Sequence, residues 1–165
     1  MKVRISDDAV AIACGADAVA AAFAAKGIDV ERVSSWGMHW LEPLVEIDGI
    51  GYGRVGPEDV TAIIAGDVPS IGPIAEHPFI ARQNRLTFAR FGKTRPLNLE
   101  DYAATGGWEG LRKAREIGAA SIVEQVIASG LRGRGGAGFP AGIKWRTVAG
   151  ASGARKYIVC NADEG

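Results

Sequence analysis

The residues best suited to binding a ligand form a glycine-rich stretch late in the chain. Gly133, Gly135, Gly136 and Gly138 follow one another in the spacing G-x-G-x-x-G. Glycine tolerates positive φ and has no Cβ to obstruct a ligand, so several backbone N–H groups in such a stretch can converge on a phosphate or a flat ring. The spacing therefore indicates a loop that binds an anionic or aromatic group.

Basic and aromatic side chains surround these glycines. Arg132, Arg134 and Lys144 add positive charge, while Phe139 and Trp145 offer flat apolar faces. This combination favours a nucleotide cofactor as the ligand. Two other interpretations stay open at this point: a tight turn without a ligand, and a loop that contacts another protein.

The glycine spacing matches two known phosphate-binding motifs only in part. The Rossmann fingerprint requires a strand before the glycines and a helix after them. Here a helix is predicted before them, and Phe139-Pro140 interrupts the segment after them. A P-loop is excluded because no Gly-Lys-Ser/Thr ends the stretch. The sequence thus predicts a glycine loop that is neither of these two motifs.

A second group of polar residues ends the chain. The apolar run at residues 156–160 predicts a buried strand, and Asn161, Asp163 and Glu164 come directly after it. Ligands commonly lie at the carboxyl ends of strands in α/β folds. Ligand contact is one interpretation of these three residues, and solvated loop residues are the other.

The sequence contains no sign of a metal site. Cys14 and Cys160 form no CxxC motif, and an iron–sulfur cluster or structural zinc site needs about four ligands. His39 and His77 have no second ligand at a metal-binding spacing. We expect reduced, structural cysteines and structural histidines, with no metal ligand and no catalytic acid or base in this chain.

The elements that must position these groups begin with an α/β module. In residues 1–66, apolar residues alternate with polar ones in the predicted strands and recur at helical spacing between them. The predicted elements are a strand at 3–6, a helix at 15–26, a strand at 28–33, a hairpin at 44–52 and a helix at 57–66. This order is typical of a thioredoxin-like domain.

Residues 67–98 are predicted to be an extended connector. Four prolines interrupt them, yet the segment is too apolar for a flexible linker and should pack along other surfaces. The expected anchors are Phe79, Leu86, Phe88 and Phe91. Residues 99–165 follow as a second domain, in which short helices begin near 99 and 107 and a third ends at Ser129, with Gly130 as its C-cap.

The composition excludes some kinds of partner. The 165 residues include 19 Lys/Arg and 19 Asp/Glu, and this zero net charge argues against a nucleic-acid partner. The positive charge gathers around the glycines, because residues 130–165 carry six Lys/Arg and two Asp/Glu. No apolar stretch approaches the roughly 20 residues of a membrane span, and the start has no signal-peptide core. We expect a cytoplasmic protein without direct membrane insertion.

Three segments together resemble the flavoprotein subunit of respiratory complex I and its relatives in NAD-reducing hydrogenases and formate dehydrogenases. They are Ser129–Pro140, Gly142–Trp145 and Lys156–Gly165, with a similar approach at Asp101–Ala114. The resemblance implies the start of that family's FMN/NADH-binding domain, with FMN and NAD as cofactors. The cofactor-binding residues that it implies are Gly133, Arg134, Gly135, Gly136, Ala137, Gly138, Phe139, Lys144, Asn161, Asp163 and Glu164.

The first 66 residues indicate which members of this family the chain resembles most. Relatives with a thioredoxin-like domain in this place often hold a 2Fe–2S cluster, but where they have Cys-x3-Cys this chain has Trp36 and Trp40. We expect these two tryptophans to fill the volume of the cluster or to contact a partner subunit. Residues 37–46 look most like the beta subunit of molybdenum-containing, NAD-dependent formate dehydrogenase.

This resemblance implies an electron-transfer (diaphorase) subunit that passes electrons between iron–sulfur clusters, FMN and NAD. The implied partners are a molybdenum-containing alpha subunit and a 2Fe–2S gamma subunit. A 4Fe–4S cluster is expected on cysteines beyond residue 165, so we expect an N-terminal part of a longer subunit that is inactive alone. The alternatives are the flavoprotein subunit of an NAD-reducing hydrogenase or a complex I-like NADH dehydrogenase, and a non-catalytic assembly module.

Overall fold

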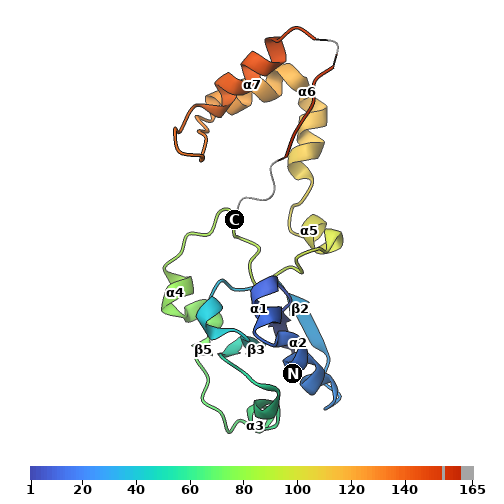
Figure 1. The fold of residues 1–165 in the computed structure, drawn as a ribbon, viewed down its shortest axis with the longest axis vertical. Coiled ribbons are helices and arrows are strands. Elements are labelled where there is room, and N and C mark those ends of the chain that lie inside the picture. Colours follow the sequence, from blue (N-terminus) through green and yellow to red (C-terminus); the bar gives the residue numbers. More distant parts are fainter. Residues whose placement is uncertain (154, 161–165) are drawn as a thin grey trace. The chain divides into compact units, whose positions relative to one another are not determined.

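The chain forms two compact units, which we describe separately. A computed structural model describes residues 1–153 and 155–160. The first unit is Met1–Gly107 and the second is Trp108–Gly165 (Figure 1). The domain boundaries at residues 66 and 98 stay predictions.

A five-stranded mixed sheet forms the centre of the first unit. Its strand order is β2-β1-β3-β4-β5, in which β1 and β2 are parallel and the other neighbours antiparallel. The strands are β1 (Val3–Ser6), β2 (Val30–Val33), β3 (Val45–Ile47), β4 (Ile50–Tyr52) and β5 (Gly72–Pro73). A parallel pair followed by an antiparallel hairpin is the predicted thioredoxin-like arrangement, and the α/β fold class is confirmed.

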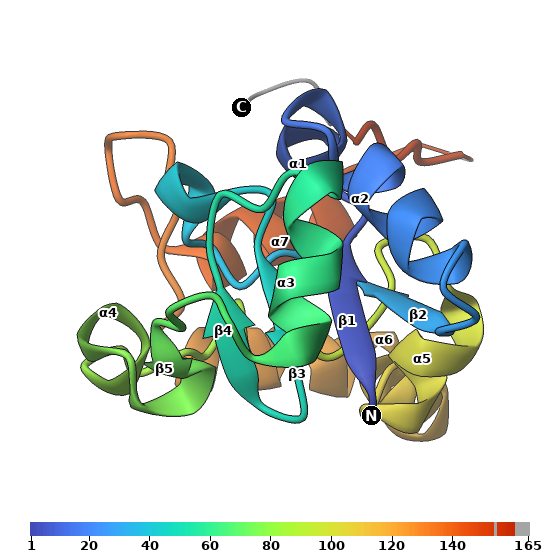
Figure 2. The same cartoon turned by 90° about the horizontal axis from the view of Figure 1, so that it is seen from below.

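Helices cover one face of this sheet and form its main core. They are α1 (Ala9–Ala13), α2 (Ala16–Ala24) and α3 (Val60–Ala65), and Figure 2 shows α2 and α3 over the same face. Val3 and Ile5 of β1 point into this core, where they pack with Val19 and Phe23 of α2. The 3-10 helix at Pro57–Asp59 leads into α3, as the proline at its start predicts.

The helix predicted at residues 15–26 corresponds to α2, and a short helix that was not predicted from the sequence, α1, precedes it. The Asp8 side chain caps α1 by accepting hydrogen bonds from the N–H groups of Val10 and Ala11 at 3.1 Å each. Gly15 then turns the chain with φ of 103°, and α2 begins at Ala16. Helix α1 was missed from the sequence because the Asp8 cap was overlooked.

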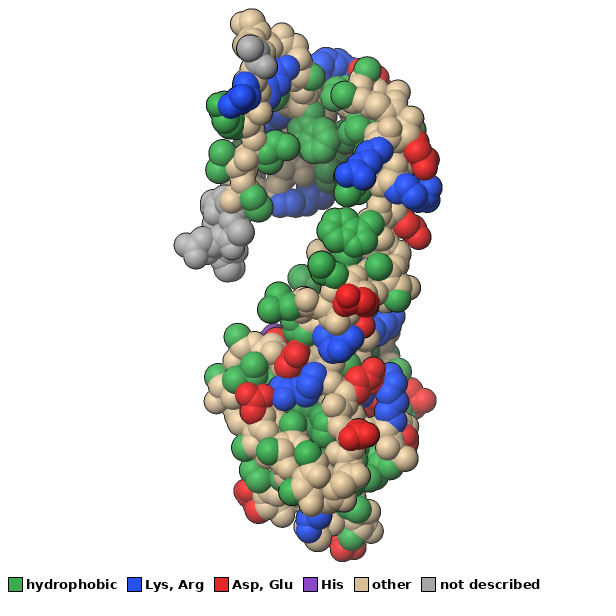
Figure 3. Space-filling view, turned by 90° about the vertical axis from the view of Figure 1, so that its right-hand side faces the viewer, with side chains coloured by type: hydrophobic (Ala, Val, Ile, Leu, Met, Phe, Trp, Pro, Cys, Tyr) green, Lys and Arg blue, Asp and Glu red, His purple; other side chains and the backbone are tan. Residues whose placement is uncertain are grey.

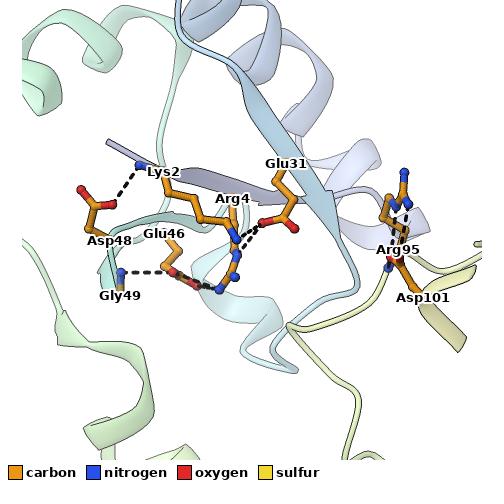
Figure 4. A network of polar contacts seen from close by, with 8 residues as sticks. All are labelled: Lys2, Arg4, Glu31, Glu46, Asp48, Gly49, Arg95 and Asp101. Atoms are coloured by element: carbon orange, nitrogen blue, oxygen red, sulfur yellow. Dashed lines mark hydrogen bonds and ion pairs between the residues drawn. The ribbon is translucent and has the colours of Figure 1, made fainter. Parts of the chain in front are cut away.

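On the opposite face, Arg4 joins three strands through ion pairs. Its Nε donates to Glu31 Oε2 of β2 at 2.7 Å, and its Nη1 contacts both carboxylate oxygens of Glu46 on β3 at 3.3 Å (Figure 4). Glu46 Oε1 also accepts from the backbone N–H of Gly49 at 3.1 Å. The Arg4 side chain therefore links β1 to both of its neighbours on this face.

The connector packs onto the first unit and contributes to its structure. It includes β5, the 3-10 helix at Ile74–Glu76 and α4 (Pro78–Ala81), and Ile74 is 5% exposed. Farther along, Gly92 packs against the Trp36 indole, and the N–H of Ser34 donates to Thr94 O at 2.6 Å. These contacts attach the segment at points that hydrophobicity did not identify.

Only part of the predicted anchor set holds. Phe91 is partly buried, and Phe79 is 39% exposed and contacts the Trp40 ring edge-on at a centroid distance of 4.8 Å. Leu86 is 89% exposed and Phe88 55%, so their prediction as anchors is wrong. The backbone contacts of residues 92–94 hold this segment instead, and they leave those two side chains at the surface.

Helices make up most of the second unit. Its helix α6 (Glu109–Ala128) bends at Gly118, where φ is 77° and ψ is 166°, and α7 (Ala141–Gly150) packs against it. A short helix, α5 (Leu99–Ala104), precedes this unit at the end of the first. Gly130 follows α6 with φ of 66°, as its predicted C-cap role requires. Within the described residues, no helix is long and apolar enough to cross a membrane.

The predicted buried strand at residues 156–160 is wrong. These residues form no strand, and Tyr157, Ile158 and Val159 are 78%, 98% and 90% exposed. A strand needs a neighbour to accept and donate its backbone hydrogen bonds. The described residues provide none beside this segment, so its apolar sequence is not sufficient to bury it.

Buried Glu42 is a further feature of the first unit. Its Oε2 accepts from the N–H of Leu44 at 2.9 Å and its Oε1 from the Ser35 hydroxyl at 3.1 Å. Burial raises the pKa of the Glu42 carboxyl above its ordinary value of 4.5, although both hydrogen bonds oppose the shift. The folded chain therefore binds the proton of this carboxyl more tightly than the unfolded chain does.

Gly92→Ala should destabilise the first unit strongly. A Cβ at Gly92 would overlap the Trp36 indole, and φ there is 71°. Overlap costs about 1–3 kcal/mol and the left-handed backbone about 1–2 kcal/mol more. Gly66→Ala is the matched control, because φ is 81° but the space is open. Urea unfolding followed by near-UV circular dichroism should show the larger loss for Gly92→Ala, and equal losses would contradict the contact.

Glu42→Gln should remove a pH dependence of stability. Because the folded pKa of Glu42 is raised, its contribution to stability is complete below the unfolded pKa and is lost as pH rises through the folded pKa. The free energy of unfolding of Glu42→Gln should therefore rise relative to that of the wild type as pH increases. Urea unfolding between acid and neutral pH measures this difference. The exposed control Glu76→Gln should show no such trend, and a constant Glu42→Gln difference would refute the prediction.

Candidate functional site

The glycine loop is closed at its base by backbone pairing. Arg132 and Pro140 form an antiparallel bridge. The N–H of Gly133 donates to Phe139 O at 2.8 Å, and the N–H of Ala141 donates to Leu131 O at 2.8 Å. Residues 133–139 therefore project as a defined loop between the end of α6 and the start of α7.

Inside the loop, the backbone N–H groups of residues 134–139 donate to no acceptor among the described residues. Gly136 and Gly138 have φ of 115° and 60°, whereas Gly135 lies outside the positive-φ region. A Cβ built at Gly135 or Gly136 meets nothing within 4 Å. The loop thus presents accessible hydrogen-bond donors, and this donor set fits the phosphate of a nucleotide cofactor.

Two arginines support the loop from within. Arg132 Nε donates to Gly138 O at 2.6 Å, and Arg134 Nη1 donates to Arg132 O at 2.7 Å. Arg132 therefore connects the start of the loop to Gly138, near its end. The sequence indicated Arg132 only as a source of charge, since nothing in the spacing shows which carbonyl it contacts.

Lys144 and Phe139 come together beside the loop. Lys144 lies in the first turn of α7, and its Nζ is 5.7 Å from the centroid of the Phe139 ring, which is 45% exposed. The N-terminus of a helix of this length also favours anions. Cationic, aromatic and N–H groups thus lie near one another at the start of α7.

Pro140 does not interrupt the structure after the loop, as the sequence had suggested. It is the N-cap residue of α7, which begins at Ala141. One half of the Rossmann pattern is therefore present. The other half is absent, because helix α6 and not a strand precedes the loop.

Close packing of α7 on α6 positions the loop. At Gly142, a Cβ would lie 2.5 Å from Ile127 Cγ1 and 2.7 Å from Ile127 Cα. Gly142 is buried, and only a residue without a side chain allows this approach. No pattern in the sequence indicated this role.

Beside α7 lies a mixed apolar and basic cavity of about 510 Å³. Trp145 and Tyr157 contribute aromatic rings to it, and Lys144 and Lys156 contribute positive charge. Figure 3 shows hydrophobic and basic side chains close together on the surface of this unit. Sequence reasoning missed this cavity because it placed residues 156–160 in a buried strand.

Three predicted site residues cannot be placed. Asn161, Asp163 and Glu164 lie outside the described residues. The structure does bring together the predicted residues 133–139 and Lys144, in and beside the loop.

The described residues include no group of three or more His, Cys, Asp or Glu side chains that could hold a metal. Trp36 is 5% exposed, which agrees with a space-filling role, but Trp40 is 49% exposed and fills no internal volume. His77 has a structural role, because its Nδ1 accepts from the N–H of Phe79 at 3.3 Å at the start of α4. Cys14 and Cys160 are free and exposed.

Comparison with known proteins identifies relatives of part of this chain. Residues 126–165 match the Complex1_51K family, described as the Nuo51 FMN-binding domain. The NADP-reducing hydrogenase subunit HndC of Solidesulfovibrio fructosivorans is 49% identical over 84 residues, which are 51% of this chain and 17% of the relative. A subunit of the NADH-quinone oxidoreductase of Rhizobium meliloti is 57% identical over 68 residues, 41% of this chain and 16% of that protein.

The matched part is small relative to the whole relatives, since it spans about 17% of HndC. A third relative, the alpha subunit of the NAD-reducing hydrogenase HoxS of Cupriavidus necator, is 54% identical over 44 residues, which are 27% of this chain and 7% of that protein. Among solved structures, a thioredoxin-like [2Fe-2S] ferredoxin from Aquifex aeolicus aligns with a TM-score of 0.36 and 21% identity over 44% of this chain and 90% of its own.

Proposed function

We propose that this chain contributes the phosphate-binding loop of an FMN and NADH site in an electron-transfer subunit of an NAD-linked oxidoreductase. The observation that carries the proposal is the set of accessible N–H groups at residues 134–139, beside Lys144 and the start of α7. The match of residues 126–165 to the Nuo51 FMN-binding domain supports the same assignment.

In this proposal the residues bind and orient, and none acts as an acid or base. The N–H groups of Gly135, Gly136 and Ala137 and the Lys144 ammonium hold the flavin phosphate, while Phe139 lies against the nicotinamide. When bound, the flavin exchanges hydride with NAD and single electrons with iron–sulfur centres. Asn161, Asp163 and Glu164 are proposed as further contacts.

Titration of isotope-labelled chain with FMN tests the loop directly. The amide signals of residues 134–139 should shift, and riboflavin, which lacks the phosphate, should bind about tenfold more weakly or worse, because hydrogen bonds to a charged group are each worth about 1.5–3 kcal/mol. Gly135→Val should abolish the shifts, since its side chain enters the open space at the loop. Gly110→Val is the control, because a Cβ there also meets nothing within 4 Å. Equal binding of FMN and riboflavin would contradict the proposal.

We further propose that the parent enzyme is a molybdenum-containing, NAD-dependent formate dehydrogenase. Residues 36–46, with tryptophans in place of thiols, support this finer assignment. The partners would be a molybdenum-containing alpha subunit and a 2Fe–2S gamma subunit, with a 4Fe–4S cluster on residues beyond this chain. The second candidate is an NAD-reducing hydrogenase, favoured by the similarity to HndC and HoxS.

Metal analysis of the native complex separates these two candidates. The complex purified from the cells that make this chain should contain molybdenum and reduce NAD with formate. A complex that contains nickel and reduces NAD with hydrogen would instead establish the hydrogenase. The metals differ because the first step of each reaction occurs on the partner subunit, so this readout does not depend on the flavin loop.

A further inference from the structure

A groove of about 470 Å³ lies on the first unit, within the size range of small-molecule sites. Arg4 and Glu46 of the sheet are among the residues that line it. Successive residues of a strand point to opposite faces, and Val3, Ile5 and Val45 point into the core beneath the helices. The groove therefore lies on the other face of the sheet, between the strands and the connector.

The connector carries an excess of positive charge to this groove. Residues 77–99 contain Arg82, Arg85, Arg90, Lys93 and Arg95 and no Asp or Glu. By contrast, residues 1–60 carry five Lys/Arg and ten Asp/Glu. The connector is therefore a basic segment next to an acidic part of the same unit. Two of its cations, Arg85 and Lys93, line the groove.

Neither of these cations is paired with a carboxylate among the described residues. Glu46 is the one acidic residue that lines the groove, and both of its oxygens contact Arg4. Arg85 donates from Nε to Gln83 Oε1 and from Nη2 to Trp36 O, both at 2.7 Å, and Nη1 has no acceptor there. Burial lowers the pKa of the Arg85 guanidinium, because desolvation disfavours the charged form. Lys93 Nζ likewise has no acceptor in the described part of the chain.

The remaining walls are apolar and partly aromatic. Ile74, Ile80 and Phe91 line the groove, and the Arg85 guanidinium lies 5.8 Å from the Phe91 ring centroid. Trp36 forms another wall and is fixed by Gly92. A ligand that fits these walls has an apolar body as well as a negative charge.

We propose that this groove binds a small organic anion with a flat apolar body and a phosphate or carboxylate group. Lys93 and the free Nη1 of Arg85 hold the anionic group, and Phe91 and Ile80 contact the body. This site is separate from the glycine loop and does not depend on the proposed flavin function.

Three matched probes test the groove on the full 165-residue chain: 1-naphthyl phosphate, 1-naphthoate and 1-naphthol. They share one ring system and differ in the group attached to it. In a titration followed by amide signals, the phosphate, the carboxylate or both should cause saturable shifts at Gly49, Gly92 and Lys93. Whichever anion binds more tightly identifies the anionic group. Naphthol should bind about tenfold more weakly, the loss expected when a charged hydrogen bond is removed.

Lys93→Ala is the variant that decides the role of the cation. Lys93 is exposed, so its removal should leave the fold intact, and it should weaken the anionic probe about five- to tenfold. Arg82→Ala is the control, because Arg82 is exposed in the same segment and does not line the groove. Absence of shifts at the three amides, equal binding of naphthol, or an unchanged affinity in Lys93→Ala would each overturn the proposal.

Discussion

The candidate flavin site depends on how closely α7 lies against α6 at Gly142. The contact there is with the backbone of Ile127 as well as its side chain, so no rotamer change can relieve an added Cβ. This contact fixes the position of the first turn of α7, which carries Lys144. The N-cap residue of α7, Pro140, forms one side of the base of the loop. The geometry of the anion-binding groups is therefore set by helix packing as much as by the loop glycines.

Much of the thioredoxin-like sheet could be predicted because its signals are local. Alternation in residues 3–6 and the Asp48-Gly49 turn depend on neighbours in the chain, and both match the structure. The strand predicted at residues 156–160 depended on a partner strand that no local pattern supplies, and it is wrong. The prediction that Leu86 is an anchor is wrong for a related reason, because hydrophobicity alone does not show which side chains of a connector pack against the rest of the protein.

The two candidate sites differ in how far the sequence reveals them. The glycine loop is continuous in sequence, so its residues could be identified from spacing, although positive φ falls at Gly136 and Gly138 and not at Gly135. The groove on the first unit joins residues as far apart as Arg4 and Lys93. No motif spans such a distance, and the sheet register and the path of the connector had to be known first.

The bend of α6 at Gly118 sets the geometry of the second unit. With φ of 77° and ψ of 166°, this residue has a backbone conformation that essentially only glycine adopts. Any other residue would favour a continuous helix of 20 residues, about 30 Å long, between Trp108 and the glycine loop. The separation of Trp108 from the glycine loop is thus set by the backbone of one residue as well as by the lengths of the two helical segments.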